Sequence, residues 1–221
     1  MSKDILLKDT VVVLSPNTPT TSFLDYSTAE LARYLKLTGA GSGRIARGNT
    51  KLGRSQITIE LTPKATGKSS EAFEISPATG SMRANCIRVR ANTAKGLTLG
   101  ITELIKGLKP AHSGLVWQRG HVKETPVNEV RGMYAHMHWA YKRPYSVRAW
   151  TLADWKRYID LLAFFGTNRL QIWVVPDIMP YPLPKGDVQF LERLREAIEY
   201  AKHCRGMFVC IGGCANTIGR P

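Results

Sequence analysis

The sequence predicts an α/β protein in which a small α+β domain precedes a series of β/α units. Over residues 1–110, short strands and two amphipathic helices follow one another in the order β-α-β-β-β-α, which is typical of a compact α+β domain. From residue 127 on, nearly all-apolar strands alternate with amphipathic helices, a pattern that indicates parallel βαβ units. Residues 111–126 are polar without a clear period, so we expect a linker there.

The expected elements of the first domain begin with a β-branched strand at residues 11–14. A helix follows, for which Ser27-Thr-Ala-Glu30 has the spacing of a capping box and Gly39 marks the end. Residues 39–53 combine glycines with basic side chains and are expected to form a loop. The remaining elements are strands near 56–61, 73–75 and 87–89 and a helix over residues 93–108, whose leucines and isoleucines recur at helical spacing.

The second domain, residues 127–221, contains three expected strands, at 130–136, 169–175 and 207–211. A helix over residues 151–165 separates the first two strands, and a second helix, which Asp187 can cap, separates the next two. Strands that are buried on both faces and joined by helices run parallel. This pattern alone fits either a doubly wound sheet or a barrel.

The charge balance raises the question of a polyanionic partner. The chain has 31 Lys and Arg against 17 Asp and Glu, a formal net charge of +14. Nucleic-acid-binding proteins concentrate such an excess on one face or tail, whereas here both halves of the chain carry a similar share. This distribution argues against a nucleic-acid partner. We keep as the alternative function a non-enzymatic protein that binds a polyanion, either nucleic acid or an acidic polysaccharide, with the basic, glycine-rich residues 41–54 as its binding segment.

Composition also limits localisation and cofactors. No run of 18 apolar residues is present, so no membrane span is expected, and the first residues lack the pattern of a signal peptide, which favours a cytoplasmic or a trimmed protein. Cys204, Cys210 and Cys214 near His203 lack the paired two-residue spacing of structural zinc sites. Free thiols are the better interpretation, and we expect neither a metal nor a cofactor.

Several segments in succession resemble one group of sugar-cleaving enzymes. Residues 91–108, ANTAKGLTLGITELIKGL, resemble the last helix of the small non-catalytic domain in family 20 β-N-acetylhexosaminidases and family 67 α-glucuronidases, and residues 73–76 and 86–90 resemble its paired strands. Residues 126–132 resemble the start of the first strand of the barrel that follows in those enzymes. Residues 154–173 resemble the next helix and strand, and are also similar to family 89 α-N-acetylglucosaminidases.

The resemblance implies that the second domain is the start of a TIM-type (β/α)8 barrel. Such a barrel needs about 250 residues, and residues 127–221 suffice for three β/α units, so an N-terminal fragment is expected. The implied enzyme is a glycoside hydrolase that cleaves O-glycosidic bonds of N-acetylated or acidic sugars. The catalytic Asp-Glu pair of family 20 lies on the fourth strand, so no catalytic residue is assigned and the fragment is expected to be inactive. The sequence around Asp177 also lacks the Asp-Asp-rich loop of family 20.

Seven residues are expected to bind substrate: six because barrel sites form at the carboxyl ends of the strands, and Arg131, at the start of its strand, because of the resemblance. Packing or a turn is the alternative role for most of them. Arg131 belongs to the Arg-Gly pair that the resemblance links to sugar hydroxyls, and its alternative is a salt bridge with Glu129. Asp177 is the only carboxylate at the carboxyl edge. The full set is Arg131, His136, His138 and Trp139 around the first strand, Trp173 and Asp177 at the end of the second, and Asn216 after the third.

Overall fold

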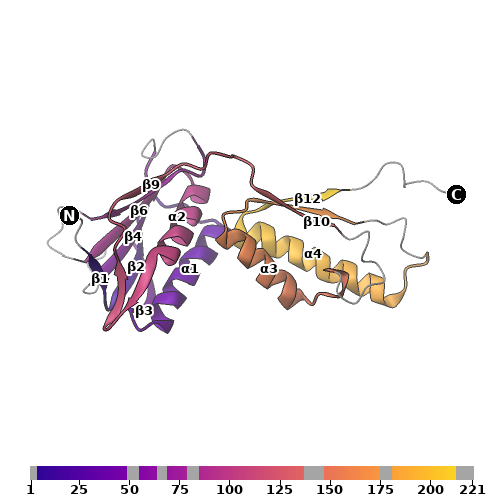
Figure 1. Ribbon diagram of the computed structural model, residues 1–221, viewed down its shortest axis with the longest axis horizontal. Coiled ribbons are helices and arrows are strands. Elements are labelled where there is room, and N and C mark those ends of the chain that lie inside the picture. Colours follow the sequence, from indigo (N-terminus) through magenta and orange to yellow (C-terminus); the bar gives the residue numbers. More distant parts are fainter. Residues whose placement is uncertain are drawn as a thin grey trace. The chain divides into compact units, whose positions relative to one another are not determined.

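The computed structural model describes residues 4–48, 55–63, 69–78, 85–136, 147–174 and 181–212. The chain divides into two compact units, Met1–Glu129 and Val130–Pro221, and each is described by itself (Figure 1). Among the described residues, no helix combines the length and the apolar character that crossing a membrane requires.

A six-stranded sheet lies at the centre of the first unit, in the order β3-β2-β4-β6-β5-β9. The first four strands of that order are parallel to one another, whereas β5 is antiparallel to both of its neighbours. Helices α1 and α2 pack on this sheet (Figure 1). The elements are β2 (Thr10–Leu14), α1 (Ser22–Leu37), β3 (Gly41–Arg47), β4 (Ser55–Leu61), β5 (Phe73–Pro77), β6 (Cys86–Ala91), α2 (Ala94–Gly107) and β9 (Val122–Glu124).

Helix α2 approaches the sheet closely because it carries glycine where it meets β5 and β6. A Cβ atom on Gly96 would lie 2.6 Å from the carbonyl oxygen of Ala72, and one on Gly100 would lie 2.8 Å from Cγ1 of Val89. Between these glycines, Leu97 is fully buried and belongs to the core of the unit. The glycines of the segment that resembles a hexosaminidase-type helix thus have a packing role.

The start of α1 differs from the sequence-based expectation. The helix begins at Ser22, and the hydroxyl of Thr21 accepts a hydrogen bond from the Leu24 amide (3.4 Å). The expected capping residue, Ser27, is buried inside the helix and donates its hydroxyl hydrogen to the carbonyl of Phe23 (2.9 Å). The capping-box assignment was wrong because a serine hydroxyl can bond to the preceding turn of a helix as well as cap one.

The loop expected over residues 39–53 was wrong for Gly41–Arg47, which is the edge strand β3, parallel to β2, and residues 49–53 lie outside the described residues. A Cβ atom on Gly41 would lie 2.5 Å from the carbonyl oxygen of Thr10, so glycine permits the close contact with the strand. Gly43 has a φ of +76°, a conformation that glycine adopts without strain. Glycines that are typical of a loop therefore lie within a strand here, where they permit close contact and a positive φ.

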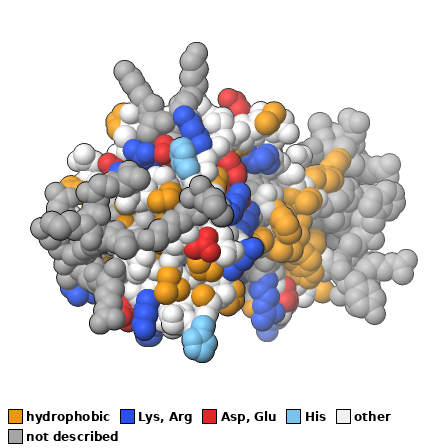
Figure 2. Space-filling view, turned by 60° about the vertical axis from the view of Figure 1, so that its left-hand side comes forward, with side chains coloured by type: hydrophobic (Ala, Val, Ile, Leu, Met, Phe, Trp, Pro, Cys, Tyr) orange, Lys and Arg blue, Asp and Glu red, His pale blue; other side chains and the backbone are white. Residues whose placement is uncertain are grey.

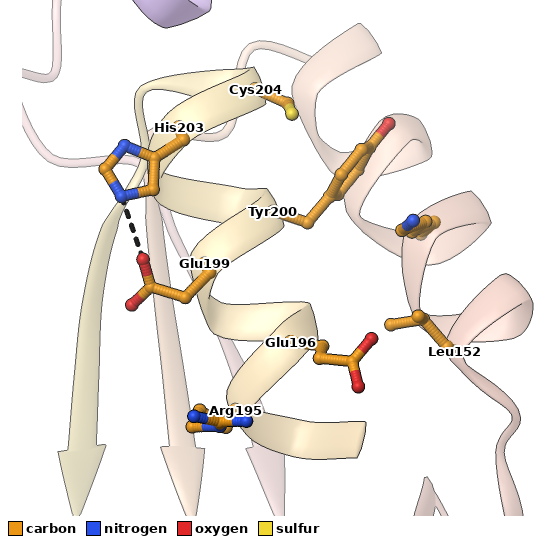
Figure 3. A pocket seen from close by; sticks show the side chains of 8 residues that line it. Leu152, Arg195, Glu196, Glu199, Tyr200, His203 and Cys204 are labelled. Carbon is orange, nitrogen blue, oxygen red and sulfur yellow. Dashed lines mark ion pairs between the residues drawn. The ribbon is translucent and has the colours of Figure 1, made fainter. Parts of the chain in front are cut away.

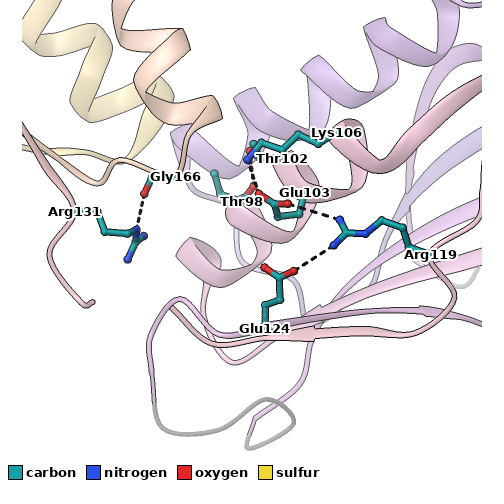
Figure 4. A network of polar contacts seen from close by, with 8 residues as sticks. All are labelled: Thr98, Thr102, Glu103, Lys106, Arg119, Glu124, Arg131 and Gly166. Carbon is teal, nitrogen blue, oxygen red and sulfur yellow. Dashed lines mark hydrogen bonds and ion pairs between the residues drawn. The ribbon is translucent and has the colours of Figure 1, made fainter. Parts of the chain in front are cut away.

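The segment expected as a linker, residues 111–126, contains regular structure instead. Strands β1 (Ile5–Leu7), β8 (Gly114–Trp117) and β7 (Leu108–Ala111) form an antiparallel sheet in that order, and β9 adds an edge to the large sheet. Trp117 is fully buried, and its indole N–H donates to the carbonyl of Gly120 (2.8 Å). Arg119 pairs with Glu103 of α2 (3.9 Å) and with Glu124 of β9 (3.4 Å; Figure 4).

The second unit contains the parallel βαβ pattern that the sequence predicts. Three parallel strands lie in the order β10-β11-β12, and helices α3 and α4 cover one face of this sheet (Figure 1). Trp155 and Ile159 of α3 and Phe190 and Leu194 of α4 share a core with Ile172 of the central strand. The elements are β10 (Gly132–His136), the short 3-10 helix η2 (Val147–Ala149), α3 (Leu152–Phe164), β11 (Arg169–Trp173), α4 (Lys185–Arg205) and β12 (Phe208–Gly212).

Asp187 does not cap α4, contrary to expectation. The N-cap residue is Pro184, without a side-chain hydrogen bond, and Asp187 is the third residue of the helix. Its side chain is completely buried and forms an ion pair with Arg148 of η2. The assignment failed because the sequence gives no sign that a distant arginine meets this carboxylate. By contrast, Thr151 caps α3 in a capping box with Asp154, and hydrogen bonds from Thr151 lower the pKa of that carboxyl.

Candidate functional site

The three parallel strands have a face that neither α3 nor α4 covers. Strand residues alternate between the two faces of a sheet, and register partners share a face. Leu170 and Ile172 are fully buried beneath the helices, so Arg169, Gln171 and Trp173 lie on the other side, which we call the open face. Their register partners on the neighbouring strands are Gly132 and Phe208 for Arg169, Tyr134 and Cys210 for Gln171, and His136 and Gly212 for Trp173.

Aromatic and amide groups gather at the carboxyl half of the open face. The rings of Tyr134 and Trp173 meet edge to face, with centroids 6.0 Å apart. A Cβ atom on Gly212 would lie 3.5 Å from Nε2 of Gln171, so the amide of Gln171 lies beside this glycine. Aromatic rings with a polar tip and an amide that both donates and accepts hydrogen bonds are groups that can hold a polyhydroxylated ring. Trp173 was expected in this place, whereas the participation of Gln171 was missed.

The amino half of the open face has a different chemistry. The guanidinium carbon of Arg169 lies 5.0 Å from the ring centre of Phe208, within the range of a cation–π contact. The neighbouring Gly132 leaves room for the Arg169 side chain. A Cβ atom added to Gly132 would lie 3.7 Å from Cβ of Arg169. The open face therefore carries a stacked cation, Arg169, at the amino ends of the strands, and aromatic and amide groups at their carboxyl ends.

Arg131 lies at the amino edge of the sheet, one residue before β10. Its Nε–H donates to the carbonyl of Gly166 (2.7 Å), as Figure 4 shows, and its backbone N–H donates to Oδ1 of Asn168 (2.9 Å). The Arg131 carbonyl in turn accepts hydrogen bonds from the amides of Asn168 (3.0 Å) and Arg169 (3.3 Å). These contacts fasten the turn after α3 to the start of β10, at the opposite edge from Trp173. They favour a structural role for Arg131, and sugar binding by this residue stays a prediction.

Replacing Arg131 by alanine is therefore expected to lower the free energy of unfolding by about 1–2 kcal/mol, because the Gly166 carbonyl loses its charged donor. Urea denaturation measures the change. Arg157→Ala is the matched control, since the Arg157 side chain is 80% exposed, and it should alter stability by less than about 0.5 kcal/mol. Unchanged stability with a loss of sugar affinity in Arg131→Ala would instead assign this residue to a sugar site.

A groove of about 560 Å³ lies between α3 and α4 (Figure 3). The Glu199 carboxylate pairs with Nζ of Lys202 (3.3 Å) and Nε2 of His203 (2.8 Å), and the hydrogen bond from Lys202 is the largest of the effects that lower the pKa of Glu199. Burial raises the pKa of the Cys204 thiol. All lining residues belong to the helix layer: Leu152, Lys156, Arg195, Glu196, Glu199, Tyr200, His203 and Cys204.

The groove lacks the chemistry of a hydrolytic site. All of its lining residues lie on α3 and α4, on the helix side of the sheet, whereas barrel sites form at the carboxyl ends of the strands. Within the described ranges no group of three or more His, Cys, Asp and Glu side chains could hold a metal ion. Cys86, Cys204 and Cys210 are free thiols, and Cys214 lies outside the described residues. The open face is thus the better candidate site.

Comparison with known proteins supports the fold of both units. No family model matches the sequence, and no curated protein matches it significantly. The chitobiase of Flavobacterium johnsoniae, a GH20 enzyme, matches with a TM-score of 0.68 and 18% identity over 96% of this chain and 32% of its own. The GH20 β-N-acetylhexosaminidase of Streptomyces coelicolor matches with a TM-score of 0.64 and 14% identity, over 96% of this chain and 43% of its own.

A GH138 enzyme that targets pectin rhamnogalacturonan II matches with a TM-score of 0.63 and 19% identity, over 91% of this chain and 24% of its own. The chain has a glycoside hydrolase-like fold. It spans between about a quarter and two-fifths of the length of these three enzymes. At such identities the likeness concerns the fold, and the activity of the glycoside hydrolases is not transferred with it.

Most of the other expected substrate-binding residues cannot be placed in this glycoside hydrolase-like fold. His138 and Trp139, Asp177, and Asn216 lie outside the described residues, and His136 is described only by its position at the end of β10. The structure therefore brings together Trp173 and the backbone position of His136 at the carboxyl edge and leaves Arg131 at the amino edge. Gln171 could have been found from the alternation of the β11 sequence RLQIW, in which every second residue is polar or aromatic.

Proposed function

We propose that the chain is the N-terminal part of a glycoside hydrolase that cleaves O-glycosidic bonds of N-acetylated or acidic sugars. The observation that supports this most directly is the aromatic and amide cluster of Tyr134, Gln171 and Trp173 at the carboxyl half of three parallel strands. In (β/α)8 barrels the helices lie outside, and substrates bind at the carboxyl ends of the strands. The likeness to GH20 and GH138 enzymes agrees with such an arrangement.

In this proposal β10, β11 and β12 are the first three strands of a TIM-type barrel, and the strands that complete it belong to a longer polypeptide. The small share of each related enzyme that the chain covers supports this view. The first unit acts as a scaffold, and the carboxyl edge of the second unit forms part of the sugar site. The partner is a carbohydrate substrate, and no metal or cofactor is part of the proposed chemistry.

The proposal assigns catalysis to later strands, because the sequences of β10, β11 and β12 contain no carboxylate. Two carboxyl groups on either side of the bond are needed, about 5 Å apart for retention of configuration and farther apart for inversion. Asp177, which follows β11, could supply at most one of them, and it lies outside the described residues.

The 221-residue chain is therefore expected to show no turnover of aryl glycosides of N-acetylglucosamine or glucuronic acid above the rate in buffer. A polypeptide that also contains the remaining strands should hydrolyse one of these substrates. Release of the chromogenic aryl group measures both. Hydrolysis by the short chain that survives Asp177→Asn would contradict the assignment of catalysis to later strands.

The alternative, a polyanion-binding protein, has one observation in its favour, the formal charge of +14. On the face that Figure 2 shows, however, Lys and Arg side chains are interspersed with Asp and Glu. In the expected binding segment, Arg47 is engaged by Asp25 (3.9 Å) and by the carbonyl of Thr18 (2.9 Å). Retention on heparin that falls steeply with salt, together with no sugar binding, would favour this alternative.

A further inference from the structure

A buried ion pair connects two segments that meet at the carboxyl edge of the β10–β12 sheet. Arg148 belongs to η2, which lies between β10 and α3, and Asp187 lies in the first turn of α4, which follows β11. In a parallel βαβ unit the helix starts at the edge where the preceding strand ends. Figure 1 shows this arrangement for α3 and α4. The pair therefore lies at the same edge as the candidate sugar site.

The pair is protected from solvent. The Asp187 side chain is completely buried, and that of Arg148 is 25% exposed. A carboxylate that stays buried without its cationic partner is strongly unfavourable, so the ion pair opposes a separation of Arg148 from Asp187. A second link runs in parallel, because Nη2 of Arg193 in α4 donates to the backbone carbonyl of Arg148 (3.5 Å).

The segment that carries Arg148 is also fixed to α3. Trp150 packs edge to face on Trp155, with ring centres 5.0 Å apart, and on Tyr158 at 5.1 Å. The next residue, Thr151, caps the helix. Arg148 thus links the start of α3 to the start of α4, and a displacement of one would be transmitted to the other.

We propose that Arg148 and Asp187 are a positioning pair, which holds η2 and the first turn of α4 together at the carboxyl edge that carries the candidate sugar site. This inference rests on the proposed function for its biological meaning, but its structural content does not depend on it. The two segments arrive from strands whose last residues, His136 and Trp173, are register partners. A site built from both needs their connections held to within a fraction of an ångström.

The chain offers a matched control at the other end of the same helices. Oδ1 of Asp160, near the end of α3, accepts hydrogen bonds from Nε of Arg205 (2.8 Å) and the hydroxyl of Tyr200 (2.7 Å) of α4. The Arg205 side chain is only 7% exposed. The Asp160 side chain is 38% exposed. Asp160→Asn therefore weakens another link between α3 and α4, but at the amino edge of the sheet.

The test compares hydrogen exchange in Asp187→Asn and Asp160→Asn with the unchanged chain. Asp187→Asn should raise exchange by about tenfold or more at residues 147–151 and 185–188, and leave residues 165–168 and 205–207 nearly unchanged. Asp160→Asn should give the reverse pattern. If Asp187→Asn does not fold, Arg148→Lys, which keeps the charge but loses the planar fork, should show the same local pattern more weakly. A uniform rise in hydrogen exchange over the whole second unit, in whichever variant folds, would overturn the proposal.

A second arm titrates the same proteins with N-acetylglucosamine and glucuronic acid. Asp187→Asn should weaken the binding of whichever sugar the unchanged chain binds by about tenfold, and Asp160→Asn should leave it unaltered. Equal affinity in both variants would overturn the positioning role at the sugar site. If the unchanged chain binds neither sugar, the proposed function fails, and the exchange pattern alone decides whether Arg148 and Asp187 position these segments.

Discussion

Replacing Trp155 by alanine is expected to lower the free energy of unfolding of the second unit by about 3–5 kcal/mol. Trp155 is fully buried and lies among the largest side chains of that core. The rings of Trp150 and Tyr158 meet it edge to face at 5.0 and 6.5 Å, so its removal takes away contacts with both rings and leaves a cavity in the core. Urea denaturation measures the loss of stability, and hydrogen exchange at residues 152–212 shows whether the loss belongs to this unit.

The control for that variant is Phe165→Ala, because the Phe165 side chain is 71% exposed. Its effect should stay within about 0.5 kcal/mol. A loss below about 1 kcal/mol in Trp155→Ala would mean that the core beneath α3 collapses freely around the missing ring, and it would contradict the packing described for the second unit.

Gly96→Val is expected to destabilise the first unit by about 3 kcal/mol, at the upper end of the range for overpacking. A Cβ atom at this position would already lie 2.6 Å from the Ala72 carbonyl oxygen and 2.8 Å from Cβ of Ala91. Neither of these atoms can rotate away, so α2 must lift from the strands beneath it. Thermal denaturation of the first unit, followed by the fluorescence of the buried Trp117, measures the effect.

Gly186→Val tests the same substitution where no clash exists. Gly186 is the second residue of α4, and a Cβ atom there would meet no atom within 4 Å. Because valine is a somewhat better helix former than glycine, stability should stay equal or rise by about 0.5 kcal/mol. If both valine variants behaved alike, the close approach of α2 to its sheet would be refuted.

The described strands and helices of the second unit could be predicted from the sequence because they depend on local patterns, whereas the burial of Asp187 could not. The expected strands at 130–136, 169–175 and 207–211 correspond to β10, β11 and β12 with small shifts at their ends. The helix expected at 151–165 is α3 with its flanking residues, and Thr151 supplies the cap. Apolar side chains at helical spacing and short strands rich in apolar side chains are patterns that can be recognised from neighbouring residues alone.

The first unit was harder to predict because several of its elements depend on distant partners. Strand β1 exists through pairing with β8, in which Leu7 lies opposite Leu115. Polar residues 111–126 give no periodic signal, since their strands β8 and β9 are only four and three residues long. The edge strand β3 was mistaken for a loop because its glycines fit a close approach to Thr10 that only the folded chain reveals.

In the candidate site, too, the residues placed by local sequence patterns could be predicted, and those placed by contacts distant in sequence could not. Trp173 could be placed at the carboxyl edge because β11 ends there, and its neighbour Tyr134 follows from the register with β10. The position of Arg131 depended on the turn at Gly166 and Asn168, which lies more than thirty residues away in sequence. The Arg148–Asp187 pair similarly joins two segments between which no sequence pattern indicates a contact.

The most direct test of the proposed sugar site is a nuclear magnetic resonance titration of the five tryptophan indole N–H groups. N-Acetylglucosamine, glucuronic acid and glucose are added separately, and Trp173→Phe assigns the Trp173 signal. We predict that N-acetylglucosamine or glucuronic acid shifts the Trp173 signal in a saturable manner. The signal of Trp117, buried in the first unit, should stay unchanged. No shift of Trp173 with any of these sugars at millimolar concentration would contradict the account.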